Sequence, residues 1–389
     1  GARMTRVLLL YGGRSEEHGV SCLSAGSVLA AIDRARYEVL TVGIARDGRW
    51  TLTDGVPAPP GPRQLPEVDP AGPTAALVGT RRGPQLVHLD DDGGRVAALG
   101  PVDVAFPVLH GPWGEDGTVQ GMLATVGLPY VGADVTASSI GIDKSAMKAA
   151  FAAAGLPQTR YRTVHRSRWR LEADTVLTEL LDALPLPWFT KPARQGSSIG
   201  ITKVTSIGDV DAAVHEALRH DDVVVVEQGI EGARELEVGV LGDADLEVTR
   251  PGEIVPSHEF YDFEAKYLDA SELRIPATVS DEVVQRCLVL GRRAYRAIGC
   301  RGLARVDLFL TTDGTLLEDR AFAWSMMDGF LDLGELIDGS LHEWSRWTGL
   351  EFPGSGSYII PDGLVPLQVD VEAGHASYVE PNVWVVHRL

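Results

Sequence analysis

Lysine is scarce in this sequence, although positive charge in general is not. Of the 35 lysines and arginines in the 389 residues, 30 are arginine, and the five lysines are Lys144, Lys148, Lys191, Lys203 and Lys266. A chain that uses arginine for its surface charge keeps lysine mainly where a compact point charge is needed. The lysines are therefore the first candidates for contacts with an anionic ligand.

Cysteine and long apolar runs are also missing. Cys22, Cys287 and Cys300 are too few and too scattered for a disulfide framework or a zinc site, which favours a reducing compartment. No stretch approaches the roughly 18 apolar residues that cross a membrane, and no signal peptide is recognisable. We therefore expect a cytoplasmic protein.

The balance of charge is strongly negative, with a net charge of −19. Nucleic acids and anionic membrane surfaces bind basic patches, so neither kind of partner is expected. A content of 44% apolar and 23% charged residues is ordinary for a globular protein. The length predicts two or three domains.

The stretch from Trp188 to Gly200 is the most informative one in the chain. An apolar run leads to Lys191, a loop containing Gly196 follows, and residues 201–204 begin and end with the β-branched residues Ile201 and Val204. This order predicts a strand, a glycine-rich turn and a second strand. Backbone N–H groups of such a turn, with one ammonium, suit a phosphate. The pattern is not a P-loop, because no Gly-Lys-Ser/Thr opens a following helix. Gly-Ser-Ser is also common in plain hairpins, but the scarcity of lysine favours the phosphate site.

The N-terminal part has the pattern of a strand-helix-strand unit. Residues 6–11 form an apolar strand that ends at two glycines, residues 24–32 have helical spacing, and residues 37–45 form the next strand. This predicts a parallel sheet whose strand ends carry a ligand site. The proline-rich residues 54–83 are expected to be irregular. A buried strand at 102–109 then leads to His110 and a Gly-Glu-Asp-Gly group.

The rest of the chain alternates between strands and helices. Asp143 is expected to be the N-cap of a helix that ends at Ala154. An aromatic and charged stretch at 260–267 is expected to be a lid or a binding loop. Other strands are predicted at 159–164, 223–226, 234–241, 303–310 and 315–319, and other helices at 118–126, 171–183, 281–298 and 331–347.

Taken together, these segments resemble the D-alanine–D-alanine ligases of the ATP-grasp superfamily. The matching residues are Gly12-Gly13-Arg14-Ser15 with Glu17 and His18, His110-Gly111 with Gly114-Glu115-Asp116-Gly117, Asp143-Lys144, Lys191-Pro192 with Gly196-Ser197-Ser198, Phe260-Tyr261-Asp262 with Lys266-Tyr267, and Arg305 with Asp307. They occur in the family's order over roughly 300 residues. The resemblance implies an α/β and α+β protein with an ATP-grasp fold. Its expected domains are an N-terminal parallel-sheet substrate domain (4–131), a central ATP-grasp domain (132–226) and a C-terminal ATP-grasp domain (227–389).

The resemblance also implies an activity. Such an enzyme transfers the γ-phosphoryl group of ATP to the carboxylate of one D-alanine, and the amine of a second D-alanine attacks the acyl phosphate. The product is a dipeptide of peptidoglycan biosynthesis, and ATP, Mg²⁺ and a homodimer are expected. Crowded negative charge in such a site is stabilised by fixed donors.

Roles for individual residues follow from the resemblance alone. Lys144, Lys191 and Lys266 would lie along the phosphates, under the backbone of Ser197 and Ser198. Glu227 would accept the adenine amino group, Ile230 would pack on the base, and Glu235 would hold the ribose. Glu17 would bind the ammonium of the first substrate, in a hydrogen-bonded group with Ser197 and Tyr267, and His110 would lie nearby. Arg305 would face the oxyanion and Asp307 would bind Mg²⁺. As alternatives, Glu227 caps a turn, Glu235 is a solvent-facing strand residue, and Tyr267 packs a loop.

The pattern departs from the family after Asp319. The family has a glutamate, one residue, an asparagine and then Pro-Gly soon after the turn at Asp313-Gly314, and no such element follows here. Glu318 is the remaining candidate for the metal-binding glutamate, and one Mg²⁺ ion is expected rather than two. Three hypotheses stay open. The chain is a D-alanine–D-alanine ligase, a specialised paralogue with another acceptor, or a nucleotide-binding protein that has lost ligation.

Overall fold

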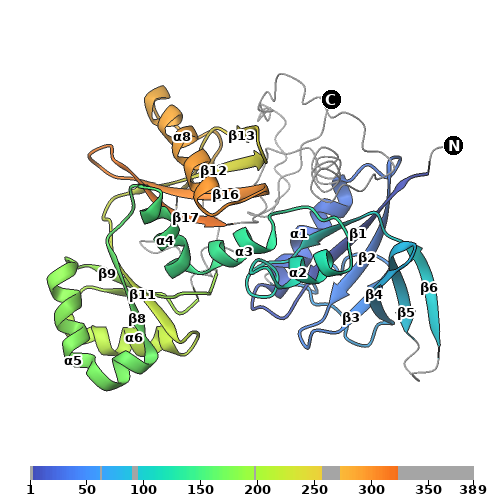
Figure 1. The fold of residues 1–389 in the computed structure, drawn as a ribbon, viewed down its shortest axis with the longest axis horizontal. Coiled ribbons are helices and arrows are strands. Elements are labelled where there is room, and N and C mark those ends of the chain that lie inside the picture. Colours follow the sequence, from blue (N-terminus) through green and yellow to red (C-terminus); the bar gives the residue numbers. More distant parts are fainter. Residues whose placement is uncertain (1–2, 62–63, 90–94, 197–198, 256–271, 323–389) are drawn as a thin grey trace. The chain divides into compact units, whose positions relative to one another are not determined.

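The computed structural model describes residues 3–61, 64–89, 95–196, 199–255 and 272–322. These residues form two compact units (Figure 1). The first unit extends to Val135 and includes Arg301–Leu303, and the second comprises Thr136–Cys300 and the described residues from Ala304 onward. The domain boundaries at 131/132 and 226/227 stay predictions. No helix of the described part is long and apolar enough to cross a membrane.

A seven-stranded sheet forms the first unit, in the order β6-β5-β4-β3-β2-β1-β7. Its elements are β1 (Thr5–Gly12), α1 (His18–Ala31), β2 (Tyr37–Ile44), β3 (Trp50–Thr53), β4 (Thr74–Thr80), β5 (Gly83–Leu89), β6 (Val96–Pro101), β7 (Val104–Val108) and α2 (Thr118–Thr125). The helix α1 begins at His18 rather than at residue 24, because the polar residues of its first turn conceal the helical spacing.

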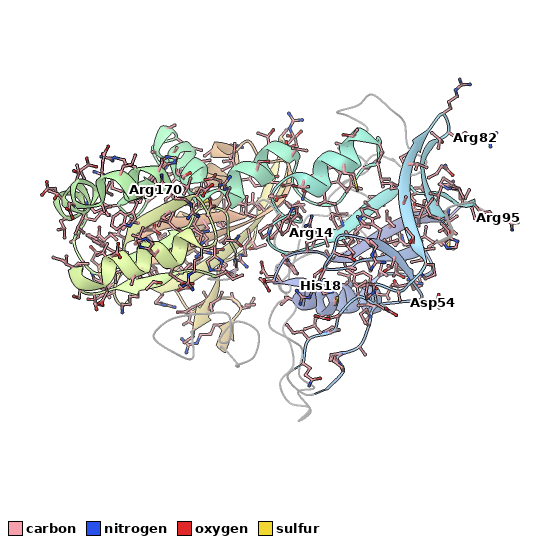
Figure 2. All side chains as sticks on the ribbon, turned by 90° about the horizontal axis from the view of Figure 1, so that it is seen from below. Arg14, His18, Asp54, Arg82, Arg95 and Arg170 are labelled. Carbon is pink, nitrogen blue, oxygen red and sulfur yellow. The ribbon has the colours of Figure 1, made fainter. Side chains whose placement is uncertain are left out.

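The sheet is mixed, which corrects the prediction of a parallel sheet. β1 pairs in parallel with both β2 and β7, as expected, but β3–β6 are joined to the sheet as antiparallel neighbours. The irregular proline-rich segment is also shorter than predicted, because β4 begins at Thr74, directly after the last proline. Arg82 and Arg95 are exposed residues at the ends of these added strands (Figure 2).

In the first unit, the loops that follow β1 and β7 begin at the same edge of the sheet. The β1 residues Val7 to Tyr11 are at most 1% exposed, and α2 packs through Val119 and Leu123 on the same face as Leu8 and Leu10. Because Tyr11 pairs with Val108 in the parallel register, the chain leaves β1 and β7 at the same edge of the sheet. The loops that follow these two strands carry Glu17 and His110.

The second unit contains a four-stranded sheet in the order β10-β9-β11-β8. Its elements are α3 (Val135–Ile142), α4 (Lys144–Ala153), β8 (Tyr161–His165), α5 (Arg166–Ala183), β9 (Trp188–Pro192), β10 (Thr202–Val204), the short 3₁₀ helix η1 (Ile207–Asp209), α6 (Val210–Leu218) and β11 (Val223–Gln228). The strand-turn-strand predicted around Lys191 is confirmed, because β9 and β10 pair as an antiparallel hairpin.

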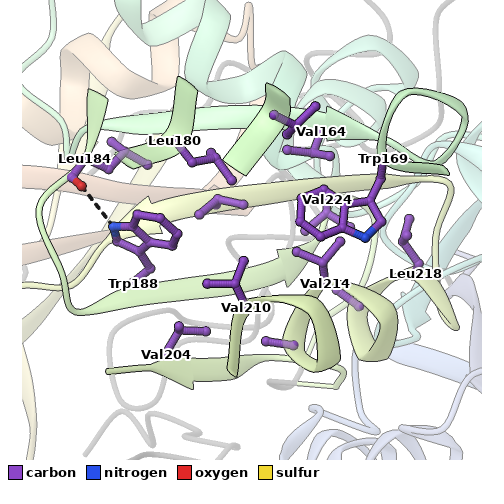
Figure 3. Close-up of a cluster of buried hydrophobic side chains, with 14 residues drawn as sticks. Val164, Trp169, Leu180, Leu184, Trp188, Val204, Val210, Val214, Leu218 and Val224 are labelled. Atoms are coloured by element: carbon purple, nitrogen blue, oxygen red, sulfur yellow. Dashed lines mark hydrogen bonds between the residues drawn. The ribbon is translucent and has the colours of Figure 1, made fainter. Parts of the chain in front are cut away.

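Helices α5 and α6 cover one face of this sheet, and their side chains interleave with Trp188, Val224 and Val226 (Figure 3). The indole Nε1 of Trp188 donates to the Leu184 carbonyl at 3.1 Å. Side chains alternate between the two faces of a strand. Tyr161, Lys191 and Glu227, which are one residue out of phase with the core positions, therefore point to the other face.

A second sheet in this unit runs β15-β14-β12-β16-β17, with β13 paired to β12. Its elements are β12 (Arg234–Gly242), β13 (Leu246–Val248), β14 (Gly252–Val255), β15 (Glu272–Arg274), α8 (Asp281–Ala297), β16 (Gly302–Leu310) and β17 (Leu316–Phe322). Helix α8 packs on β12 closely at Gly291, where an added Cβ would lie 2.8 Å from Val238. Ser280 caps this helix by accepting from the Val283 N–H.

Candidate active site

A buried group of charges lies on the face of the four-stranded sheet opposite α5 and α6. The Lys191 ammonium is 2.5 Å from Glu227 Oε2 and 3.7 Å from Asp319 Oδ1, and the Lys191 residue is 6% exposed. Burial lowers the pKa of Lys191, but the charges of Glu227 and Asp319 outweigh burial and raise it. Lys191 is therefore a fixed cation inside the second unit.

Glu227 is held from a second direction by Lys148, a residue that the sequence analysis did not assign to the site. The Lys148 ammonium lies 2.5 Å from Glu227 Oε1 and 3.2 Å from the Thr159 hydroxyl, which itself donates to Glu227. Burial disfavours the charged carboxylate, but the Lys148 and Lys191 charges hold the pKa of Glu227 well below its usual range. The scarcity of lysine, and the four-residue spacing from Lys144 on one helix, are the signals that point to Lys148.

Lys144 anchors the start of α4 to the glycine-rich hairpin. Its ammonium donates to the carbonyls of Pro192 at 3.2 Å and Gln195 at 2.5 Å. Burial, then the charges of Arg320 and Lys191, hold the pKa of Lys144 well below its usual range. The predicted N-cap is confirmed, because the Asp143 carboxylate accepts from the backbone N–H groups of the first turn of α4.

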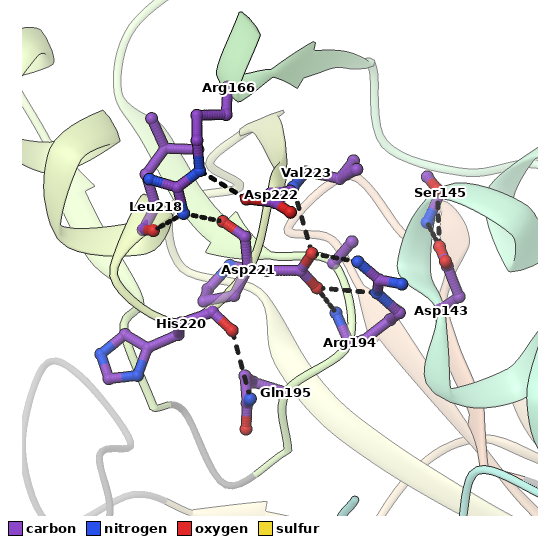
Figure 4. Close-up of polar contacts among 12 residues, drawn as sticks. Asp143, Ser145, Arg166, Arg194, Gln195, Leu218, His220, Asp221, Asp222 and Val223 are labelled. Atoms are coloured by element: carbon purple, nitrogen blue, oxygen red, sulfur yellow. Dashed lines mark hydrogen bonds and ion pairs between the residues drawn. The ribbon is translucent and has the colours of Figure 1, made fainter.

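The hairpin is also pinned at its base (Figure 4). The Asp221 carboxylate accepts from the Arg194 guanidinium at 2.5 and 3.0 Å, from the Arg194 backbone N–H at 2.8 Å and from the Val223 N–H at 3.1 Å. Backbone hydrogen bonds and the guanidinium charge outweigh burial and lower the pKa of Asp221. The turn therefore leaves β9 from a rigid base. Its tip residues Ser197 and Ser198 lie outside the described residues, as do Lys266, Tyr267 and the stretch at 260–267.

Two further residues of the predicted nucleotide site follow β11. Ile230 is half-buried in the connection to β12, and Glu235 is half-buried near the start of β12, where it pairs with Ile254 of β14. Glu227 is thus near the end of β11, Ile230 lies in the loop that follows, and Glu235 is near the start of β12. Their contacts with a nucleotide stay a prediction.

Arg305 and Asp307 lie together on β16. The guanidinium donates to both Asp307 carboxylate oxygens, at 2.7 and 2.9 Å, and is 3.3 Å from Glu237 Oε1 on β12. Across the strand pair, Asp307 is in register with Arg320. The Arg320 side chain is only 14% exposed and lies 3.3 Å from Asp319 Oδ2. Both basic residues, Arg305 and Arg320, are thus paired with acidic side chains where the metal site was predicted, and Arg305 occupies both oxygens of Asp307.

Glu318 does not join them. A bulge shifts the register between Asp307 and Leu308, so that Leu308 pairs with Glu318, and both of these residues are buried. Asp307 and Leu308 are consecutive and point to opposite faces. The Glu318 carboxylate has no hydrogen-bond partner within the described part of the chain, and burial raises its pKa well above its usual range. Glu318 and Asp307 therefore point to opposite faces of the sheet, and a metal-binding role for Glu318 stays a prediction.

In the first unit, the loops after β1 and β7 are tied to each other. The Ser15 hydroxyl donates to the His110 carbonyl at 2.6 Å and accepts from the Glu17 N–H at 3.2 Å. The Nε2 atom of His110 lies at hydrogen-bonding distance, 3.0 Å, from the Ser24 hydroxyl. The structure thus brings Glu17 and His110 together, as the resemblance implies for a first-substrate site.

Gly111 allows the backbone after β7 to pass close to the Glu17 carboxylate. It has φ +71°, and an added Cβ would lie 2.5 Å from Glu17 Oε2. Its N–H donates to Glu115 Oε2 at 2.8 Å. Glu17 is 5% exposed, so its carboxylate is a buried acceptor at the strand edge, of the kind that binds an ammonium group.

His18 supports the loop after β1 from inside (Figure 2). Its Nδ1 is 2.6 Å from the Gly13 carbonyl, and its Nε2 is 3.0 Å from the Val68 N–H. A neutral ring that donates from Nδ1 and accepts at Nε2 satisfies both partners. Burial lowers the pKa of His18, which favours this neutral form. His18 is therefore a support for the loop rather than a proton donor to a ligand.

Comparison with known proteins places these features in one family. The family model described as "D-ala D-ala ligase N-terminus" matches residues 6–133, and "D-ala D-ala ligase C-terminus" matches residues 150–319. The second match ends where the sequence departs from the family pattern. The D-alanine–D-alanine ligase of Mycobacterium ulcerans is 49% identical over 327 residues, which cover 81% of this chain and 86% of the relative.

A second relative and two solved structures agree with this. The D-alanine–D-alanine ligase of Paenarthrobacter aurescens is 43% identical over 370 residues, 89% of this chain and 96% of the relative. The ligase structure from Coxiella burnetii has a TM-score of 0.73 at 25% identity and covers 90% of this chain and 97% of that one. The VanG D-Ala:D-Ser ligase of Enterococcus faecalis has a TM-score of 0.69 at 28% identity, with 88% and 99% covered. The chain therefore belongs to the D-alanine–D-alanine ligase family and has its ATP-grasp fold.

Proposed function

We propose that this chain is an ADP-forming ligase that joins the carboxylate of one D-alanine to the amine of a second amino acid. The γ-phosphoryl group of ATP passes to the carboxylate, which yields ADP and an acyl phosphate. The amine then attacks the acyl carbon, the amide bond forms and inorganic phosphate leaves. Both steps gather negative charge, so the protein contributes mainly fixed positive groups and positioning.

The observation that carries this proposal is the position of Lys191. It lies between Glu227, a buried ionised acceptor, and Asp319, and the hairpin that bears Lys191 is closed by Lys144 and Asp221. An acceptor for an adenine amino group and cations for phosphates thus occur on one sheet face. In the proposal Lys144, Lys191, Lys266 and Ser198 contact the phosphates, while Glu227, Ile230 and Glu235 contact the nucleoside.

The first amino acid is proposed to bind in the first unit. Glu17 accepts its ammonium group, with Ser197 and Tyr267 completing a hydrogen-bonded group, and His110 lies beside it. Two observations support this assignment: the Ser15 hydroxyl accepts from the Glu17 backbone N–H at 3.2 Å, and the Glu17 carboxylate lies so close to residue 111 that only glycine leaves room for it. Arg305 is proposed to stabilise the oxyanion.

ADP release in the presence of ATP, Mg²⁺ and a panel of D- and L-amino acids tests the activity, with mass detection of the product. We expect release of ADP that depends on D-alanine, because Glu17 and the nucleotide face are both preorganised. Binding of ATP by calorimetry without ADP release for any amino acid would contradict the proposal and favour a nucleotide-binding protein that has lost ligation.

A second candidate is a ligase of the same type with another acceptor. The family match ends at Asp319, and one of the similar structures is a D-Ala:D-Ser ligase. In the same assay, a second amino acid that increases ADP release more than additional D-alanine does would identify this alternative.

The family uses ATP and Mg²⁺, and the residues here fit two metal ions poorly. Mg²⁺ requires several oxygen ligands in octahedral geometry. Within the described ranges no group of three or more acidic, histidine or cysteine side chains is placed to hold a metal. Asp307 is paired with Arg305, and Glu318 faces the other way. We therefore propose that one Mg²⁺ ion at most is held firmly, with Asp307 as its protein ligand.

Replacing Arg320 by alanine tests this metal proposal. The Arg320 guanidinium lies close enough to Lys144 and Lys191 to lower the pKa of Lys144, so it adds positive charge where a second ion would do so. We expect slow dipeptide synthesis from D-alanine with dependence on one metal ion, and a further loss of about tenfold or more in R320A, as for a lost charge-assisted contact. The exposed Arg219→Ala is the control. Rapid dipeptide synthesis with two-ion dependence in a Mg²⁺ titration would show that other ligands complete the site.

We also propose that the protein is a homodimer, as the family resemblance implies. The mass of the protein in solution, measured by light scattering, checks it.

A further inference from the structure

Lys148 is a buried charged residue of the second unit that the proposed chemistry does not use. Its side chain is 1% exposed, although an ammonium is almost never buried without a partner. Its head is enclosed by Glu227 Oε1 at 2.5 Å, by the Thr159 hydroxyl at 3.2 Å and by the Tyr161 ring, whose centroid is 5.4 Å away. These contacts bring together α4, β8 and β11, so Lys148 belongs to a built arrangement and not to the surface.

The contacts of Glu227 leave little of its carboxylate free. An ionised carboxylate accepts about four hydrogen bonds. Lys148 and Thr159 occupy Oε1, and Lys191 occupies Oε2. One acceptor position then remains for a donor that enters from outside. A group held this firmly discriminates sharply between ligands that donate and ligands that accept a hydrogen bond.

The two lysines have different surroundings. Lys191 is shared between Glu227 and Asp319, and in the proposed function it also contacts phosphates. Within the described residues, the ion-pair partner of Lys148 is Glu227 alone. When a nucleotide draws Lys191 toward its phosphates, Lys148 keeps Glu227 compensated.

We propose that Lys148 is a positioning residue for base selection, which keeps the Glu227 carboxylate ionised and oriented to accept from the 6-amino group of adenine. This inference rests on the proposed function, in which Glu227 contacts the base. An acceptor-only carboxylate rejects a purine with an oxygen at position 6, because two acceptors would face each other. Without Lys148, the buried carboxylate is protonated more easily and then donates to such an oxygen.

The charges around Glu227 set the pH at which its carboxylate is protonated and changes from a hydrogen-bond acceptor to a donor. Burial opposes the ionised form, and Lys148 and Lys191 restore it. Loss of Lys148 leaves one direct cation, so the pKa of Glu227 rises in the variant. The other charged or titratable groups near this cluster, from every element that packs on it, are Lys144 of α4, Tyr161 of β8, and Glu318, Asp319 and Arg320 of β17.

The test compares ATP with inosine triphosphate, which has an oxygen at position 6. The ratio of the two kcat/KM values is measured from pH 6 to pH 9 for the full chain and for Lys148→Met, Lys148→Arg and the exposed control Lys203→Met. Lys148→Met is expected to reduce the ratio about tenfold or more, as for a lost charged contact, and most at low pH. Lys148→Arg is expected to retain part of the preference, and Lys203→Met all of it.

Thr159→Val removes the hydroxyl contact to Glu227 without removing a buried charge, so it serves if Lys148→Met does not fold. We expect a smaller reduction of the ratio in this variant, by about threefold to tenfold, because one donor to the carboxylate is lost while the Lys148 charge stays in place. An unchanged ratio in Lys148→Met, or in Thr159→Val where Lys148→Met does not fold, would overturn the inference. A wild-type protein that accepts both nucleotides equally would instead overturn the assigned role of Glu227, and with it the base contact of the proposed function.

Discussion

Replacing Glu227 by glutamine is expected to destabilise the protein by about 3–5 kcal/mol, as found when one partner of a buried ion pair is removed. Glu227 is 2% exposed, and two ammonium groups lie 2.5 Å from its oxygens. A neutral amide leaves Lys148 and Lys191 as buried charges that repel each other. Urea unfolding at pH 7 measures the loss as a lower transition midpoint.

Two further variants show whether the loss comes from uncompensated charge. Glu231→Gln, in the exposed connection between β11 and β12, is the matched control and should leave the midpoint unchanged. Adding Lys148→Met to Glu227→Gln should recover part of the stability, because Lys148, which loses its ion-pair partner in Glu227→Gln while Lys191 keeps Asp319, is then absent. A double variant that is less stable than Glu227→Gln alone would mean that packing, and not charge, governs this site.

Gly111→Ala is expected to lower kcat/KM for the first D-alanine by about 10²–10³-fold. At φ +71° a side chain is strained, and the new Cβ would lie 2.5 Å from Glu17 Oε2. The strain costs about 1 kcal/mol, and displacing a carboxylate from a charged ligand costs about 1.5–3 kcal/mol more. Because the carboxylate is proposed to bind the substrate ammonium, the Michaelis constant for the first amino acid should rise most, while ATP binding by calorimetry stays unchanged.

Gly121→Ala is the control for this substitution. Gly121 lies within α2, and an added Cβ there meets no atom within 4 Å. Alanine is about 1 kcal/mol more favourable than glycine inside a helix, so this variant should be fully active and slightly more stable. Full activity of Gly111→Ala at low D-alanine concentration would show that Glu17 does not bind the first substrate.

Local patterns predicted the parts of the site that depend on neighbours in the chain. The hairpin around Lys191 followed from apolar residues on both sides of a glycine-rich turn, and the Asp143 cap followed from the residue type at a helix start. The meeting of the loops at Glu17 and His110 was implied by the family resemblance, and the parallel pairing of β1 with β7 accounts for it. Each of these outcomes depends on a short segment or on one simple rule of chain geometry.

Other features needed contacts between distant residues. Lys148 and Glu227 are far apart in sequence, and their pairing depends on how α4 packs on the sheet. The strands β3–β6 make the first sheet mixed, because they pair with their neighbours in the antiparallel direction. The proline-rich composition of residues 54–83 gave no sign of this pairing. Glu318 looked like a metal ligand, but one bulge in β17 turned it into the core beside Leu308.

The sequence by itself determined the family, the fold class and the order of the nucleotide and substrate segments, because these depend on residue types at set positions along the chain. Only the tertiary structure decided which charges compensate one another. Coulomb energy depends on distance and burial, and neither is encoded in spacing along the chain. The cluster of Lys148, Glu227 and Lys191, and the separation of Glu318 from Asp307, therefore appeared only when the strands and helices were packed together.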